Sequence, residues 1–345
     1  MKEIGFRNRI HWMSFFLCAL VVGVHSQNAE LFALTEESSL GARLLIRFQD
    51  FIALELGQIA VPGFFMISAY LFYRNFSFSK LFSKWKSRIF SILVPFVVWN
   101  VLYYGLYCLM SSLPFLSRIS DVDGVVLSTS ELWSAIVNYS YNPVFWYLFQ
   151  LILLIVSAPF LYAFLHQRIL GLLFLGAAWM AVALQIQIGL LNADALVYYA
   201  TAAYAALHAR NLVETAFGKK GLLLGAACVL LSVLPQLLFP SFLFPVPVVL
   251  LRLGVPTGLW MIGKEVPVPK VRGWMKGTFF VYATHFLIVR SLNKLAVLWF
   301  EGSVLAAFLL YIIDIVAAFA LAELGRRILG RYLPFFWKLI SGGRY

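Results

Sequence analysis

Two histidines lie within apolar runs of the chain, where a polar ring is uncommon. His25 lies near the end of the run LVVGVHSQN, and His285 lies near the middle of FFVYATHFLIV. An imidazole gains and loses a proton near neutral pH, so it is suited to proton transfer. An ionisable group at membrane depth is a functional candidate by default, although both rings could simply form hydrogen bonds with neighbouring helices.

Three of the charged residues within apolar runs are further candidates. Asp314 lies in YIIDIV, where an unpaired carboxylate is costly, so a pair with Arg290 or Arg252 across helices is predicted. Arg290 lies five residues after His285, and its long side chain can reach the membrane surface. His285, Arg290, Asp314 and Arg252 therefore form a predicted second polar site. Three uncharged residues, Ser68, Asn100 and Gln150, are predicted to hydrogen-bond between helices.

The composition indicates which elements must position these residues. Of the 345 residues, 62% are hydrophobic and 12% are charged, whereas soluble domains are about a quarter charged. The apolar runs are long and continuous, which favours membrane-spanning helices over a membrane β-barrel. Cys18, Cys108 and Cys228 all lie in such runs, so we expect reduced thiols and no metal site.

A helix needs about 20 residues to cross the hydrocarbon, and ten runs approach that length. The run 195–208 is short, and the run 246–262 is interrupted by Pro247, Gly254 and Pro256. The predicted fold class is an all-α polytopic membrane protein with about ten transmembrane helices, forming a single domain over residues 1–345. The ten runs are 10–27, 52–73, 89–111, 144–166, 168–187, 195–208, 220–240, 246–262, 276–296 and 302–325.

The charge distribution predicts the orientation of these helices. If the N-terminus is cytoplasmic, most of the 27 basic residues fall in cytoplasmic segments, as the positive-inside rule requires. Both termini are then cytoplasmic, and the net charge of +12 needs no nucleic-acid partner. The longest extracytoplasmic loop is 112–143, with Asp121 and Asp123; it has a role of its own or is a solvated connector.

Soluble catalytic motifs are missing from the sequence: it contains no GxSxG elbow, P-loop, HExxH or paired-cysteine metal site. Five apolar motifs stand out instead. In order and spacing they resemble the membrane-bound acyltransferase 3 family, which O-acylates cell-envelope sugars, and the resemblance runs over most of the chain. The motifs are VVGVHS at 21–26, VPGFFMISAYLFYRNF at 61–76, KSRIFSILVPFVVWN at 86–100, NPVFWYLFQLILL at 142–154 and FFVYATHFLIV at 279–289.

The resemblance implies a specific chemistry. Cytoplasmic acyl-CoA is the expected co-substrate, with no bound cofactor, and the acceptor is a hydroxyl of an extracytoplasmic polysaccharide or glycolipid. Acetyl or succinyl is the expected group, and the expected location is the inner (plasma) membrane of a bacterium. His25 matches the family histidine and is the expected general base, a transient acyl-imidazole being the alternative. Arg88, Lys86 and Lys84 are expected to bind the phosphates of the donor, unless they only set the topology.

The chain departs from the family pattern at several positions. Ser14 and Gln58 stand where relatives carry arginine, and Gln150 also replaces a charged position; Arg252 or Arg290 could supply a compensating cation. The alternative function is a glycan or lipid transporter or exporter of the same fold without acyl transfer, in which 195–208 and 246–262 would be discontinuous helices. A structural or regulatory descendant of the enzyme is a third possibility.

Overall fold

A computed structural model describes residues 3–113, 124–239 and 244–344. Within these ranges the regular structure is helical, apart from one isolated bridge between Ile188 and Leu191. Asp121 and Asp123, on which the prediction of an acidic outer loop partly rests, lie outside the described residues, as do Lys2 and Arg118.

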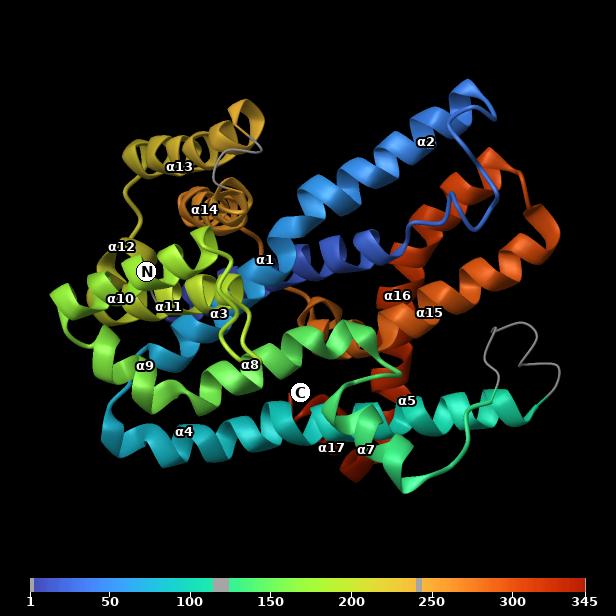
Figure 1. Cartoon of the computed structure of the whole chain (residues 1–345), viewed down its shortest axis with the longest axis horizontal. Coiled ribbons are helices and arrows are strands. Elements are labelled where there is room, and N and C mark those ends of the chain that lie inside the picture. The colour runs from blue at the N-terminus through green and yellow to red at the C-terminus, as the bar shows by residue number, and fades with distance from the viewer. Residues whose placement is uncertain (1–2, 114–123, 240–243, 345) are drawn as a thin grey trace. The chain divides into compact units, whose positions relative to one another are not determined.

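Each of the ten predicted apolar runs falls on a helix of the structure (Figure 1). This follows from the physics of the sequence, because an apolar run of that length can satisfy its backbone hydrogen bonds internally only as a helix. The helices are α1 Glu3–His25, α2 Leu40–Asp50, α3 Ala60–Tyr73, α4 Leu81–Arg88, α5 Val94–Ser112, α7 Thr129–Val137, α8 Trp146–Val156, α9 Ala158–Leu165, α10 Arg168–Ala183, α11 Ala193–His208, α12 Arg210–Glu214, α13 Lys219–Leu238, α14 Val246–Gly263, α15 Thr278–Phe300, α16 Val304–Tyr332 and α17 Pro334–Ser341.

The described part of the chain contains five helical stretches that are long and apolar enough to cross a membrane. A bent pair, Pro143–Val156 with Ala158–Leu165, makes a sixth if it forms one span. The chain is therefore an all-helical membrane protein, while the ten spans and the cytoplasmic termini stay predictions. The five stretches are Leu40–Tyr73, Phe78–Ser112, Lys219–Leu238, Val246–Gly263 and Val304–Tyr332.

Two details of the predicted spans are wrong. The run 144–166 is not one straight helix, because it bends by 61° between α8 and α9; Pro159 in the first turn of α9 has no N–H to continue the helix. In contrast, α14 runs unbroken from Val246 to Gly263. Pro247 lies in its first turn, where a missing N–H costs nothing, and Pro256 lies inside the continuous helix. The discontinuity that the transporter alternative proposes for this run therefore does not occur.

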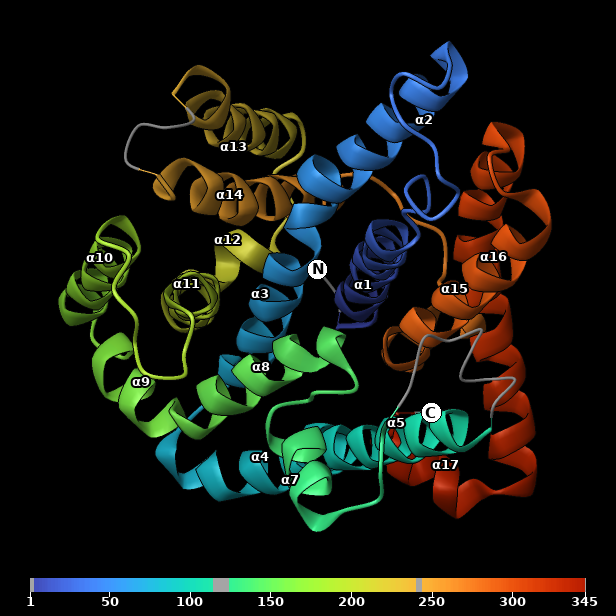
Figure 2. The same cartoon turned by 45° about the vertical axis from the view of Figure 1, so that its right-hand side comes forward.

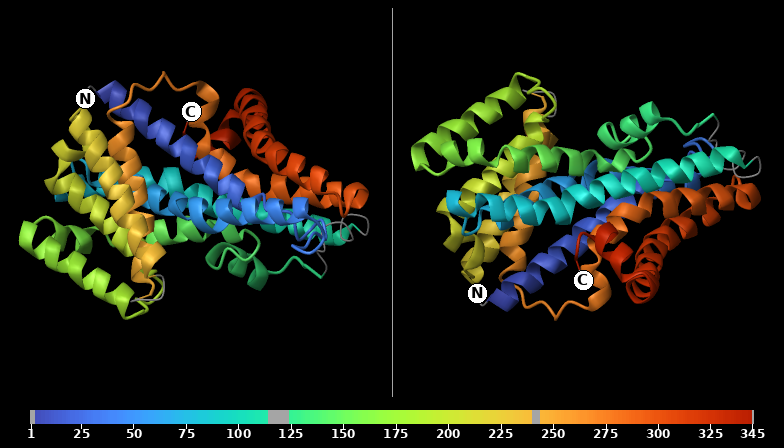
Figure 3. Two further views of the ribbon diagram at one scale, coloured as in Figure 1. Left: turned by 90° about the horizontal axis from the view of Figure 1, so that it is seen from above. Right: turned by 90° about the horizontal axis from the view of Figure 1, so that it is seen from below.

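The described helices belong to two compact units. Unit 1 comprises Met1–Leu17, Gln58–Lys86 and Gln150–Lys276, and unit 2 comprises Cys18–Gly57, Ser87–Phe149 and Gly277–Tyr345. The residues of helix α1, dark blue in Figure 3, are divided between unit 1, up to Leu17, and unit 2, from Cys18.

Unit 1 is held together by close helix pairs. Helix α3 packs against α11 and α14, and α13 lies beside α14 along its length (Figures 1 and 2). The α13–α14 contact is tight because small residues face each other: a Cβ on Gly258 would lie 2.6 Å from the carbonyl oxygen of Gly225. Small residues at such positions let the two backbones approach closely.

We expect Gly258→Ala to destabilise the protein by about 1–3 kcal/mol, because the added methyl group overpacks the α13–α14 contact. The matched control is Gly263→Ala in the same helix, where an added Cβ would meet no atom within 4 Å. Thermal unfolding in detergent measures both variants. Equal melting temperatures for the two would show that the contact is not tight.

In unit 2, α15 packs against α16, and α17 packs against α5 and α16 (Figure 2). A buried amide network fixes the segment that follows α1. Gln49 Oε1 accepts hydrogen bonds from the backbone N–H groups of Asn28 and Ala29, and Asn28 Nδ2 donates to the carbonyl of Ala307. Because all these groups are buried, the network holds the end of α1 in place, and His25 with it.

Candidate functional site

The two histidines of the apolar runs form a pair in unit 2. His25 is the last residue of α1 and His285 lies in α15, and their ring centroids are 5.2 Å apart. The ring of Phe286 closes the site, with its centroid 5.6 Å from that of His25 and its plane at 86°. The sequence predicted roles for both residues at separate sites, and the fold brings them together.

The hydrogen bonds of His285 determine its tautomer. Its side chain is fully buried, and Nδ1 lies 2.7 Å from the carbonyl oxygen of Tyr282. A carbonyl only accepts, so the proton of the neutral ring is on Nδ1 and Nε2 keeps a lone pair. That Nε2 has no hydrogen-bond partner. His25 is partly buried, and no hydrogen bond joins its ring to the described part of the chain, so its ring nitrogens are not engaged by these protein groups.

Three aromatic residues hold α15 at the turn before His285. The hydroxyl of Tyr282 donates to the carbonyl of Val144, and its ring stacks on Phe145 at 5.5 Å and 6°. Tyr103 donates to the carbonyl of Ala283 at 2.9 Å. Phe145 belongs to the NPVFW motif, so that motif has a structural role: it supports the segment that carries His285.

Two buried asparagines of unit 2 have unsatisfied side chains. Asn100 and Asn142 are nearly inaccessible to solvent, and neither amide oxygen nor amide nitrogen has a partner. The prediction that Asn100 hydrogen-bonds between helices is therefore wrong. Sequence reasoning missed Asn142, although its place at the start of NPVFW was a usable signal. An unsatisfied buried amide is costly, so each of these residues is a candidate for completing its hydrogen bonds with a substrate or water.

Among the described residues of unit 2, Asp314 forms no ion pair with an arginine, so the predicted pair with Arg290 is wrong. Its Oδ2 accepts a hydrogen bond of 2.6 Å from Asn293, which lies about two turns beyond His285 on α15. Arg290 is exposed, as expected for a side chain that reaches outwards, and its guanidinium lies 5.9 Å from the centroid of the Phe286 ring. The same ring contacts His25, so Arg290 places a positive charge one ring away from the histidine pair.

Arg252 lies in unit 1 and is bound by polar side chains there. Its Nη2 donates to Oε1 of Gln58, and its Nη1 lies 3.9 Å from Oδ2 of Asp194. Arg252 therefore brings a guanidinium to Gln58 from a different helix, at a position where the family resemblance leads us to expect an arginine.

The three predicted donor-binding residues have different surroundings. Lys84 donates to the carbonyl of Phe72 and lies over its ring at 5.3 Å, so it anchors α4 to the end of α3. Lys86 is exposed. Arg88 lies close enough to Arg344 to contribute, with burial as the larger cause, to lowering the pKa of Arg344 to about 10.

Sequence reasoning missed Arg344, which follows α17 in a short basic tail. Its guanidinium carbon lies 4.2 Å from the centroid of the Phe279 ring, and its Nη1 is buried without a partner. The hydroxyls of Ser91 and Ser341 are also buried without partners. Gly342 packs on the backbone of Ser91, where a Cβ would come within 2.6 Å of the carbonyl oxygen. Arg344 therefore has an N–H group, and Ser91 and Ser341 have hydroxyls, with which an anion could complete its hydrogen bonds.

The described part of the chain is a helical membrane protein in which His25 and His285 form a pair. The acyltransferase-domain model of the acyltransferase 3 family matches residues 7–323. The chain therefore belongs to the acyltransferase 3 family, as its motifs indicated, and is an acyltransferase. No curated protein and no solved structure matches it.

Proposed function

We propose that this acyltransferase moves an acetyl or succinyl group from cytoplasmic acyl-CoA to a hydroxyl of an extracytoplasmic polysaccharide or glycolipid. The observation that carries the proposal is the His25–His285 pair, in which one ring is open and the other is fixed by Tyr282. The positive-inside distribution of basic residues supports an outer position for His25 at the end of its helix, where it would meet an acceptor outside the cell.

In the transfer step, a ring nitrogen of His25 takes the proton of the acceptor hydroxyl while its oxygen attacks the thioester carbonyl. The new C–O bond forms, the C–S bond breaks, and the departing thiolate of coenzyme A takes the proton back from the imidazolium. His285 is proposed to assist this step. Its Nε2 carries a lone pair with no hydrogen-bond partner, and its ring centroid lies 5.2 Å from that of His25. Arg290 adds a positive charge nearby, which favours the negative charge that develops on the carbonyl oxygen.

The donor's phosphates are proposed to bind the basic cluster of Arg88 and Arg344. Guanidinium groups form charge-assisted hydrogen bonds with phosphate, often in pairs. Phe279 touches Arg344, and Tyr282 contacts Phe279 on one side and His285 on the other, at 6.4 Å and 6.1 Å between ring centroids. One face of α15 therefore leads from the phosphate site to the histidine pair.

The experiment that tests the function follows the thioester. Purified protein in lipid nanodiscs, given acetyl-CoA and an envelope glycan extract, is expected to release free coenzyme A only when acceptor is present, with acetyl ester appearing on the glycan. A glycan or lipid transporter of the same fold would release none. The unbroken α14 removes one argument for that alternative, because the expected discontinuity at Pro256 does not occur. Thioester that stays intact with every acceptor would count against the enzyme.

A further inference from the structure

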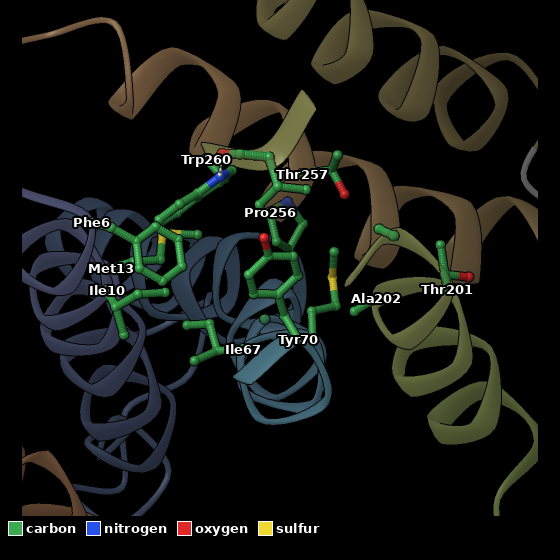
Figure 4. A pocket seen from close by; sticks show the side chains of 14 residues that line it. Phe6, Ile10, Met13, Ile67, Tyr70, Thr201, Ala202, Pro256, Thr257 and Trp260 are labelled. Carbon is green, nitrogen blue, oxygen red and sulfur yellow. Dashed lines mark hydrogen bonds between the residues drawn. The ribbon is translucent and has the colours of Figure 1, made fainter. Parts of the chain in front are cut away.

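Unit 1 encloses an apolar cavity that the acyl-transfer chemistry does not use. It has a volume of about 150 Å³ and lies among α1, α3, α11 and α14 (Figure 4). The rings of Phe6, Tyr70 and Trp260 form much of its wall, and Met13 and Pro256 complete it. None of the lining residues belongs to unit 2, which holds the histidine pair.

Three polar groups in the wall of this cavity are already engaged. The hydroxyl of Tyr70 donates to Glu214, the indole N–H of Trp260 donates to the carbonyl of Val213, and Thr257 donates to a carbonyl of its own helix. A mainly apolar cavity of this kind accepts apolar groups, and one of similar volume in another protein holds benzene. This cavity therefore has room for about six carbon atoms of a hydrocarbon chain.

A larger polar hollow of about 600 Å³ adjoins the cavity and shares Phe6 and Ile10 with it. An apolar pocket next to a charged one matches an amphiphile, with its chain in the first and its headgroup in the second. The polar residues that line the hollow are Glu3, Arg7, His11, Arg74, Asn75 and Arg210.

The charges of this hollow form one connected network. Arg74 bridges Glu3 and Glu214 at 2.8 Å each, Arg7 pairs with Glu3 at 2.8 Å, and Arg210 pairs with Glu214 at 2.9 Å. Hydrogen bonds from Arg74 and Arg7 lower the pKa of Glu3 to about 2. Burial alone would raise the pKa of Glu214, but the hydrogen bonds from Arg74 and its neighbours lower it overall. Both carboxylates are therefore ionised at neutral pH, and three guanidiniums against two carboxylates leave one positive charge.

We propose that unit 1 binds an anionic membrane lipid, with its phosphodiester headgroup in the polar hollow and the start of one chain in the apolar cavity. A phosphodiester carries a single negative charge, which balances the single positive charge of the network. A zwitterionic lipid brings no net charge, and a nucleotide with several phosphates such as coenzyme A brings too much. Guanidinium groups are well suited to phosphate oxygens.

The test uses the full-length protein, purified in detergent and freed of lipid. Phosphatidylglycerol, phosphatidylcholine with the same chains, and coenzyme A are added separately, and binding is followed by native mass spectrometry and by the rise in melting temperature. We expect phosphatidylglycerol to bind about tenfold more tightly than phosphatidylcholine. Coenzyme A is expected to change the melting temperature of the wild type and of the unit 1 variants by the same amount.

Charge variants make the expectation specific, because two of them should act in opposite directions. Arg210→Gln makes the network neutral and should remove the preference for phosphatidylglycerol. Glu3→Gln raises the net charge and should increase that preference. Ala202→Leu fills the cavity and should weaken both lipids alike, whereas Ala177→Leu on the exposed face of α10 is the matched control and should change neither.

Equal binding of the two lipids by the wild type would overturn the proposal, as would Arg210→Gln and Glu3→Gln shifting the preference in the same direction. Undiminished lipid binding by Ala202→Leu would also overturn it. Because the assay measures binding and needs no acyl transfer, its outcome is independent of the proposed enzymatic activity.

Discussion

Replacing His25 with alanine is expected to reduce acyl transfer by about 100- to 10,000-fold, the usual contribution of a general base. The ring is the open member of the histidine pair, and no other titratable side chain of the described chain contacts it except His285. The measurement is the acceptor-dependent release of coenzyme A from acetyl-CoA by protein in nanodiscs. The folded state of the variant is checked by its melting temperature.

A matched control tests whether the loss of activity is specific to His25 or follows from replacing any histidine of the chain. His166 is exposed and its Nδ1 faces carbonyls of its own helix, at 2.9 Å and 3.0 Å, so His166→Ala should keep full activity. The alternative of an acyl-imidazole predicts that acceptor-free enzyme accumulates labelled acetyl on His25, whereas a general base predicts none. Transfer at the normal rate by a well-folded His25→Ala protein would contradict both mechanisms.

The positions of the helices could be predicted from the sequence, but the bend within one of them could not. Apolar runs predict helices because the hydrocarbon leaves the backbone no other partner, and in the described residues each of the ten runs is helical over most of its length. The bend near Pro159 was not predicted. An apolar run that contains a proline has the same sequence pattern whether the helix bends at the proline or continues through it, as α14 does at Pro256. Packing by neighbouring helices decides between the two outcomes, and the sequence does not contain that information locally.

In the candidate site, too, the sequence identified individual residues but not the contacts that depend on how distant helices pack. The types of His25 and His285 were enough to select them, because an ionisable ring in an apolar run is costly to keep. Their pairing depends on α1 meeting α15, which no local pattern reveals. Asp314 was assigned an arginine partner because charge pairs are the cheapest way to bury a carboxylate, yet the fold presents the shorter Asn293 instead. Arg344 looked like one more basic residue of the C-terminal tail until α17 placed it beside Arg88.

The second large effect is expected from replacing Arg88 or Arg344, the two arginines of the basic cluster. Arg88→Gln and Arg344→Gln are each expected to raise the KM for acetyl-CoA about tenfold or more, because a hydrogen bond to a charged group contributes about 1.5–3 kcal/mol. The change should appear in KM rather than in kcat, since the phosphates are held equally in the ground state and the transition state. Lys338→Gln, an exposed cation on α17, is the matched control and should leave KM unchanged.

An acetyl donor without phosphate groups distinguishes binding of the donor by the arginines from a structural role of the arginines. S-acetyl-N-acetylcysteamine carries the same thioester as acetyl-CoA but has nothing for the arginines to bind. Wild type, Arg88→Gln and Arg344→Gln should therefore use it equally and poorly, so that the penalty of each variant disappears with the phosphates. If the variants are as impaired with this short donor as with acetyl-CoA, the arginines stabilise the fold of unit 2 and do not bind the donor. A wild-type KM that is the same for both donors would likewise mean that the phosphates contribute nothing at this cluster.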